Sequence, residues 1–223
     1  FPALSKLTHD PARQTAAAVR ATQLLMLVTA PLNLLQAALA GPLVRLIFAP
    51  KWEPAVPVLQ VLSLTMAMGI MSAPTISLFK ARGHYGQYFV WSLGGALVTM
   101  AMVAPAATIG PVAVAWAVCI YCFLYAPLAL VLFFVPRGPW LATIWKLFLL
   151  PMLLGAVAVG LPAGVAQLIP LLRDYDLINI LFVTPVAAAV HLLLFRTFAP
   201  EAWHDAAQHV TPLLASLRSR LKI

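Results

Sequence analysis

Charge is what this chain has least of. Only 9% of its 223 residues are charged and 63% are hydrophobic, whereas a soluble domain has roughly 25% charged residues. The apolar residues are gathered in runs of membrane length, and none of the six carboxylates falls inside such a run. A run of about 20 residues with almost no charge is typical of a helix that crosses a bilayer. The composition therefore excludes a water-soluble globular domain.

The lack of acids inside the runs also limits the chemistry. An ionisable group at the centre of a membrane helix costs about 2.5 to 3.5 kcal/mol and persists only where it is used. The absence of acidic residues from the apolar runs argues against a carboxylate proton relay and against an enzyme with paired acids. The sequence also has no HxxxH pair, no nucleophile elbow and no phosphate-cradling glycine loop. We expect no enzyme, no catalytic residue, no metal site and no cofactor.

Cysteine is also scarce. Cys119 and Cys122 form a CxxC inside an apolar run, without further ligands or a partner pair. We interpret them as small core residues, and a metal or redox role is the weaker alternative.

The six apolar runs are separated by short polar corners and predict an all-α integral membrane protein. The expected spans cover about residues 21–48, 57–79, 88–108, 112–135, 144–169 and 177–198. Residues 1–20 are expected to form a cytoplasmic lead-in with a short helix that Asp10 and Pro11 begin. Residues 199–223 read as a cytoplasmic amphipathic tail, with a disordered tail as the alternative because Pro212 interrupts the apolar stripe. The chain begins without Met or a signal-peptide pattern, so we expect it to be part of a longer protein.

The basic residues predict an orientation. With six spans, one face of the membrane receives Lys6, Arg13, Arg20, Lys80, Arg82, Arg137, Lys146, Arg196, Arg218, Arg220 and Lys222, and the other receives Arg45, Lys51 and Arg173. The positive-inside rule places the richer face, with both ends of the chain, in the cytoplasm. The net charge of +8 is thus explained by topology, and no basic patch with interleaved aromatics indicates a nucleic-acid partner.

Five residues remain as candidates for binding. Lys80 and Arg82 follow the second span on the cytoplasmic side, while Arg45 and Lys51 lie at the corner on the opposite side. Such cations can attract the pyrophosphate of a lipid-linked sugar, but topology and headgroup anchoring are the favoured explanation for each of them. Pairing with Glu53 or with lipid headgroups is the favoured explanation for the corner cations. The fifth candidate, His191, lies well inside a span, where it either hydrogen-bonds to a neighbouring helix or reaches the interface, or contacts substrate or a proton.

Three stretches together resemble a known family. They are FPALSKLTHDPAR, LVRLIFAPKWEPAVPVLQVLSL and LFKARGHYGQY, and they are similar to the Wzx-type polysaccharide and O-antigen flippases of the multidrug/oligosaccharidyl-lipid/polysaccharide exporter superfamily. The resemblance covers about residues 1–135; beyond these only the span pattern agrees.

The resemblance implies a transporter of about twelve to fourteen helices in two lobes that rock about a central cavity. The present six spans would form the larger part of one lobe, and the remaining lobe would come from the missing N-terminal part of the same chain. The implied partners are a lipid-linked oligosaccharide and membrane lipids, and the implied location is the bacterial cytoplasmic (inner) membrane. The alternatives are a drug or cation antiporter of the same superfamily and a membrane enzyme of polysaccharide assembly such as a polymerase. The lack of span carboxylates weakens the first, and the short corners weaken the second.

Overall fold

The computed structural model describes residues 10–69, 72–134, 140–200 and 202–204 of the chain. Within these ranges all regular structure is helical. Six helical segments are long and apolar enough to cross a membrane, and they cover Pro11–Ala38, Pro50–Ala81, Tyr85–Ala107, Pro111–Phe133, Leu141–Leu168 and Asp176–Phe198. The predicted class, an all-α integral membrane protein with six spans, is confirmed for the described part of the chain. Helices suit a bilayer because its core has no water to hydrogen-bond a free backbone group.

The first helix begins earlier than the predicted span. α2 (Pro11–Ala38) unites the predicted short helix with the span expected from residue 21. The Asp10 side chain caps it as predicted, accepting a hydrogen bond from the backbone N–H of Arg13 at 3.0 Å. The predicted span then divides at Leu39, after which α3 (Ala40–Ile47) forms a separate short helix.

The remaining elements follow the apolar runs. They are the 3-10 helix η1 (Pro50–Ala55), α4 (Val56–Gly69), α5 (Ser72–Ala81), α6 (Tyr85–Ala107), α7 (Pro111–Phe134), α8 (Trp140–Ile144), the π-helical η2 (Trp145–Leu149), α9 (Leu150–Leu168), α10 (Pro170–Asp174) and α11 (Asp176–Phe198). The predicted amphipathic tail beyond residue 204, the lead-in at 1–9 and the corner at Arg137 lie outside the described residues.

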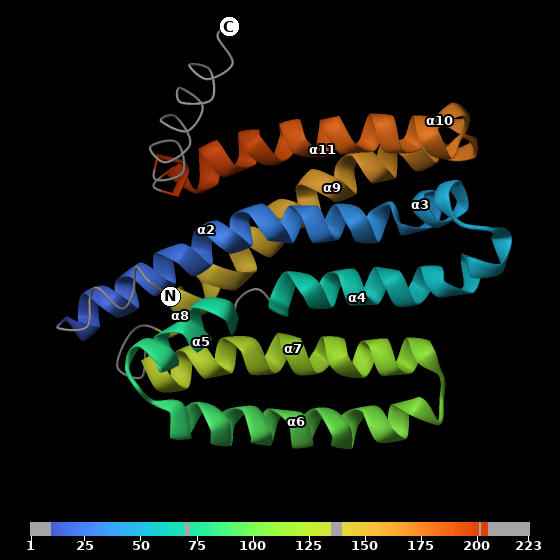
Figure 1. Ribbon diagram of the computed structural model, residues 1–223. Helices are drawn as coiled ribbons and strands as arrows, with labels where there is room; N and C mark the ends of the chain where they lie inside the picture. The colour runs from blue at the N-terminus through green and yellow to red at the C-terminus, as the bar shows by residue number, and fades with distance from the viewer. Residues whose placement is uncertain (1–9, 70–71, 135–139, 201, 205–223) are drawn as a thin grey trace, which may run out of the picture.

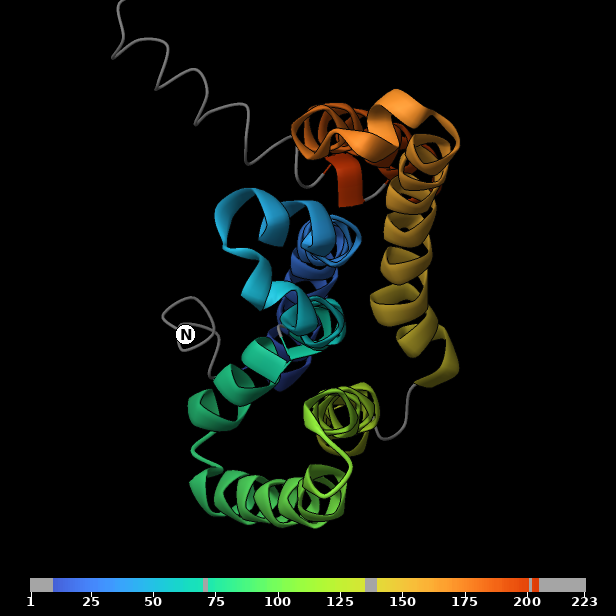
Figure 2. The ribbon, with the colours of Figure 1, turned by 90° about the vertical axis from the view of Figure 1, so that its right-hand side faces the viewer.

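The long helices form a row in the order α11, α9, α2, α4, α7 and α6 (Figure 1). Seen after a 90° turn, the row is curved, and α2 and α4 lie in its middle (Figure 2). α9 runs obliquely across α2 in Figure 1. The first described helix of the chain is therefore also a central helix of the row. Helices α3 and α10 lie at the same end of the bundle, which we call the α3–α10 end.

α2 is central because both of its sides are packed. Met26 on one side belongs to a cluster with Ala67 and Met68 of α4. Leu27 on the other side packs with Leu154 of α9 and with the C-terminal part of α11. Lipid tails are as apolar as leucine, so close van der Waals contact rather than exclusion of water favours this packing.

Helices α2 and α9 approach each other closely at a glycine. A Cβ added to Gly155 would lie 3.2 Å from the backbone N and Cα of Pro31 and 2.9 Å from Cδ1 of Leu34. The two helix backbones thus meet where α9 has no side chain, as is common between membrane helices.

Candidate functional site

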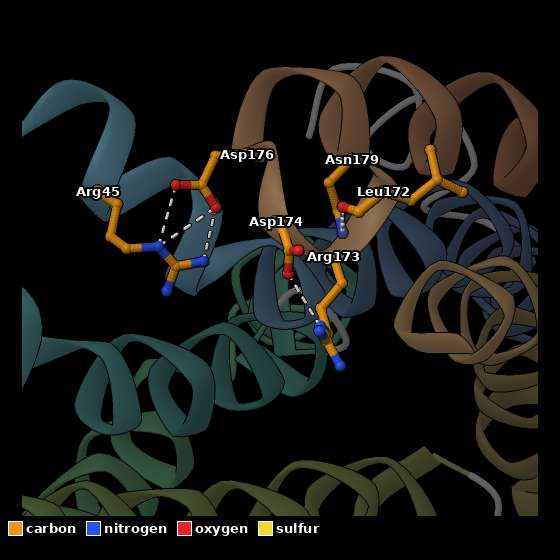
Figure 3. Close-up of polar contacts among 6 residues, drawn as sticks. All are labelled: Arg45, Leu172, Arg173, Asp174, Asp176 and Asn179. Carbon is orange, nitrogen blue, oxygen red and sulfur yellow. Dashed lines mark hydrogen bonds and ion pairs between the residues drawn. The ribbon is translucent and has the colours of Figure 1, made fainter. Parts of the chain in front are cut away.

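A bidentate ion pair joins α3 to α11. Nη2 of Arg45 lies 2.6 Å from Oδ1 of Asp176, and Nε of Arg45 donates to both carboxylate oxygens at 3.0 and 3.2 Å (Figure 3). The Arg45 side chain is 45% exposed and that of Asp176 is 24% exposed. The hydrogen bond that Arg45 donates to Asp176 raises the pKa of the Arg45 guanidinium, although burial acts in the opposite direction. The sequence predicted Glu53 or lipid headgroups as the partner of Arg45; the structure shows Asp176 in that place.

The location of the two residues in their helices favours the pair. Arg45 lies in the last turn of α3, where the helix dipole is negative, and Asp176 is the first residue of α11, where it is positive. Each charge therefore stabilises its own helix end as well as the contact between the helices.

The corner beside this pair is held by further polar contacts. Nε of Arg173 donates to Oδ1 of Asp174 at 3.0 Å, and Nδ2 of the buried Asn179 donates to the carbonyl of Leu172 at 3.0 Å (Figure 3). The amide of Asn179 thus satisfies a carbonyl of α10 and fixes α10 against the start of α11.

Three of these residues, Arg45, Arg173 and Asn179, line a polar cavity of about 370 Å³ at the α3–α10 end. Its polar side chains are Arg45, Gln60, Gln167, Arg173 and Asn179, which come from α3, α4, α9, α10 and α11. We call it the end cavity. Guanidinium groups recognise phosphate and carboxylate, and amide side chains both donate and accept hydrogen bonds. The end cavity therefore offers donors for an anionic or hydroxyl-rich ligand at one end of an otherwise apolar bundle.

Lys51 does not line the end cavity. It lies exposed in η1, and the cavity receives Arg45 but not Lys51 from the predicted pair of corner cations. The structure thus separates two residues that the sequence had grouped.

Arg82 is engaged in contacts with the start of α2. Its Nε donates to Oε1 of Gln14 at 3.0 Å, and its Nη2 donates to Oγ1 of Thr15 at 2.6 Å and to the carbonyl of Pro11 at 2.8 Å. Burial lowers the pKa of this guanidinium. Arg82 therefore connects the corner after α5 to the first turns of α2.

Lys80 lies in the last turn of α5 and is exposed. It differs from Arg82 in this respect, although the sequence placed both cations at the same rim. Lys80 is thus the more accessible of the two to a ligand that approaches this end.

His191 hydrogen-bonds to a neighbouring helix, which is the first of the alternatives open at the sequence level. Its Nε2 lies 2.8 Å from the carbonyl oxygen of Leu27 in α2, and the residue is 8% exposed. The carbonyl of Leu27 would normally accept from the N–H of residue 31, but residue 31 is proline and has no N–H. His191 supplies the missing donor. The pattern of a proline in one span and a lone histidine in another was available in the sequence, but the pairing was not.

Metal ligation has no support among the described residues, where no three His, Cys, Asp or Glu side chains gather into a site. Cys119 and Cys122 are free cysteines, the first buried against Val61 and Ala115 and the second half-buried. Their surroundings are those of core side chains.

Fold and site together define a multi-pass α-helical membrane protein with a polar cavity at one end. Comparison with known proteins gives this class a narrower context. Residues 1–57 match the family described as polysaccharide biosynthesis protein. No solved structure matches the chain.

Two curated proteins are similar to it. The succinoglycan biosynthesis transport protein ExoT of Rhizobium meliloti is 31% identical over 104 residues, which cover 47% of this chain and 21% of ExoT. The teichuronic acid biosynthesis protein TuaB of Bacillus subtilis is 26% identical over 172 residues, which cover 72% of this chain and 34% of TuaB. The aligned parts thus span about a third or less of either relative. These similarities relate the chain to proteins of polysaccharide biosynthesis and export.

Proposed function

We propose that the chain is part of a flippase that moves a lipid-linked oligosaccharide across the bacterial cytoplasmic membrane for surface polysaccharide export. The observation on which this rests is the end cavity, where three amide side chains from membrane-length helices meet two guanidinium side chains from the short helices α3 and α10. The similarity to ExoT, a transport protein of succinoglycan biosynthesis, and to TuaB supports the same substrate class.

The end cavity has donors suited to a phosphate and a sugar. The ion pair with Asp176 uses Nε and Nη2 of Arg45, and Nη1 has two further N–H donors. Gln60 and Gln167 offer the amide groups that hydrogen-bond to sugar hydroxyls. In this proposal the guanidinium groups bind the phosphate while the amides bind the sugar.

Translocation follows from alternating access between two lobes. We propose that these six spans form the larger part of one lobe and that the other lobe belongs to the same full-length protein. The excess of basic residues at the end opposite Arg45 and Arg173 supports cytoplasmic termini. The end cavity then faces away from the cytoplasm, where a translocated sugar leaves the protein.

A coupled antiporter and a membrane enzyme both fit less well. The carboxylates that the described spans contain, Glu53 and Asp176, lie in first turns rather than at helix centres. A proton- or cation-coupled exporter generally uses an acid deep in the membrane. We therefore propose a non-catalytic role in lipid-linked sugar export.

The test replaces the two cavity glutamines in the full-length protein. We expect Gln60→Leu/Gln167→Leu to lower translocation of lipid-linked oligosaccharide into reconstituted vesicles and to lower surface polysaccharide in cells. Lys51→Gln, a polar change at the same end but outside the end cavity, serves as the matched control. Normal export in the double variant, with normal amounts of protein in the membrane, would contradict the proposal.

A further inference from the structure

A second and larger hollow lies between α6 and α7. It has a volume of about 730 Å³ and an almost entirely apolar lining. On α6 its floor is a stripe at every fourth position, Gly86, Val90, Gly94, Val98 and Met102. Residues four apart lie on one face of a helix, so the stripe is continuous along α6. We call this hollow the α6–α7 groove.

The groove is also lined by a stacked set of aromatic rings, which we call the aromatic wall and which comes from both α6 and α7. The Trp91 and Tyr125 rings stack at 4.3 Å between centroids, and Tyr121 and Tyr125 stack at 4.7 Å. The Tyr125 hydroxyl donates to the backbone carbonyl of Trp91, which fixes the ring across the two helices. A Cβ at Gly95 would lie 2.7 Å from the Tyr125 hydroxyl, so α6 and α7 approach closely behind the groove. The ring stacking and the Tyr125 hydrogen bond thus hold the aromatic wall in place before a ligand binds.

The length of the groove distinguishes between possible occupants. At 1.5 Å per residue, the stripe from Gly86 to Met102 extends over about 24 Å of helix. One leaflet of the hydrocarbon core is only about 15 Å thick. An acyl chain of a phospholipid ends near the midplane and fills only part of the groove, whereas a longer chain of isoprene units fills all of it.

A cation precedes the groove along the chain. Gly86 is the second residue of α6, and the exposed Lys80 lies in the last turn of α5, before the short corner that joins the two helices. Arg82, in the same corner, has its guanidinium on α2. The amphiphile that suits a long apolar groove, on a helix that closely follows a lysine in the chain, has a phosphate head and an extended hydrocarbon chain.

We propose that the α6–α7 groove binds the polyprenyl chain of a polyprenyl phosphate, with the phosphate at the Lys80 end and the chain along the Gly86–Met102 stripe. This inference rests on the proposed function and adds a location for the lipid part of the substrate, separate from the end cavity. The aromatic wall and Gly94, which has no side chain, set the width of the groove that receives the chain.

The experiment uses the full-length protein in nanodiscs of phosphatidylcholine and phosphatidylglycerol. The probe is a photoreactive long-chain polyprenyl phosphate, and labelled peptides are located by mass spectrometry. Gly94→Leu projects into the groove, because a Cβ there meets nothing within 4 Å. Gly160→Leu is the matched control, since Gly160 is equally open on α9. Val98→Trp fills the same groove from the next turn if Gly94→Leu fails to assemble.

We expect labelling of α6 and α7 in the unmodified protein and a loss of about fivefold or more in Gly94→Leu, equivalent to roughly 1 kcal/mol. Gly160→Leu should label normally, and Lys80→Gln should weaken labelling. Farnesyl phosphate should compete poorly, because its chain is short.

Unchanged labelling in both groove-filling variants would overturn the inference, as would equal competition by phosphatidylglycerol, which indicates ordinary lipid. If labelling appears only on other helices while vesicle translocation is normal, the groove proposal alone is wrong. If no part of the protein is labelled and translocation is absent, the proposed function fails with it.

Discussion

The imidazole Nε2 of His191 lies 2.8 Å from the carbonyl oxygen of Leu27, the one carbonyl of α2 from which Pro31 removes the helical donor. His191, which the sequence left open as a contact for substrate or a proton, therefore has a structural role. The imidazole supplies the hydrogen bond that is missing from one turn of α2, although His191 and Leu27 are 164 positions apart in the sequence.

Replacing His191 by Leu should destabilise the protein by about 0.6 kcal/mol, and by at most about 1.7 kcal/mol, which are the average and the maximum found for hydrogen bonds between membrane helices. The reason is the buried Leu27 carbonyl, which loses its donor. Unfolding of the protein in mixed micelles measures the loss.

The control is the same change in a Pro31→Ala background. Alanine restores the N–H of residue 31, so the His191→Leu change should cost less there than in the unmodified protein. An equal cost in both backgrounds would show that His191 contributes through packing alone.

Replacing Arg45 by Gln should destabilise the α3–α10 end by up to about 1 kcal/mol at low ionic strength. The pair is partly exposed, so the difference from the unmodified protein should shrink in about 1 M salt, where the Debye length is near 3 Å. Exchanging the two charges with Arg45→Asp/Asp176→Arg should restore only part of the stability, because each charge then opposes its helix dipole. Full restoration would mean that the dipoles are unimportant here.

Replacing Gly155 by Ala should weaken the contact of α2 with α9 by about 1 to 3 kcal/mol, because the new methyl group meets the backbone of Pro31. The matched change Gly160→Ala meets no atom within 4 Å. It should leave stability unchanged or raise it by up to about 1 kcal/mol through helix propensity. Similar melting curves for the two variants would disprove the close approach.

Lys80 and Arg82 should respond differently to replacement by Gln. Arg82→Gln removes the donors to Gln14, Thr15 and Pro11, so it should lower the unfolding temperature. Lys80→Gln should leave the unfolding temperature unchanged and lower translocation of lipid-linked sugar in the full-length protein. A thermal shift from Lys80→Gln, or normal translocation with it, would exclude a direct contact of Lys80 with substrate.

The class of the fold follows from the sequence because it depends on composition and on length. Apolar runs and the Asp10 cap are local signals, and both are confirmed. The division of the first predicted span at Leu39 was not foreseen, because an apolar run gives the extent of a span but not the interruptions of its helix.

Pairings between distant helices required the structure. The partner of Arg45 lies 131 positions away, and the nearer Glu53 was the natural guess from sequence distance alone. The tally of basic residues placed Arg45 and Arg173 on the same side of the membrane, but it could not show that Arg45 pairs with Asp176. The end cavity is lined by residues of six helices and the α6–α7 groove by residues of two, and no single stretch of sequence predicts either of them.

The central position of α2 has a consequence for biosynthesis. Ribosomes deliver α2 to the membrane first among the described spans, whereas its partner His191 arrives with the sixth. Until α11 is inserted, the Leu27 carbonyl lies in hydrocarbon without a hydrogen-bond donor, and such an unsatisfied backbone group is energetically unfavourable. When α11 packs against α2, His191 supplies the missing hydrogen-bond donor. Nascent chains that stop before α11 lack this donor, and we expect quality-control proteases to recognise them.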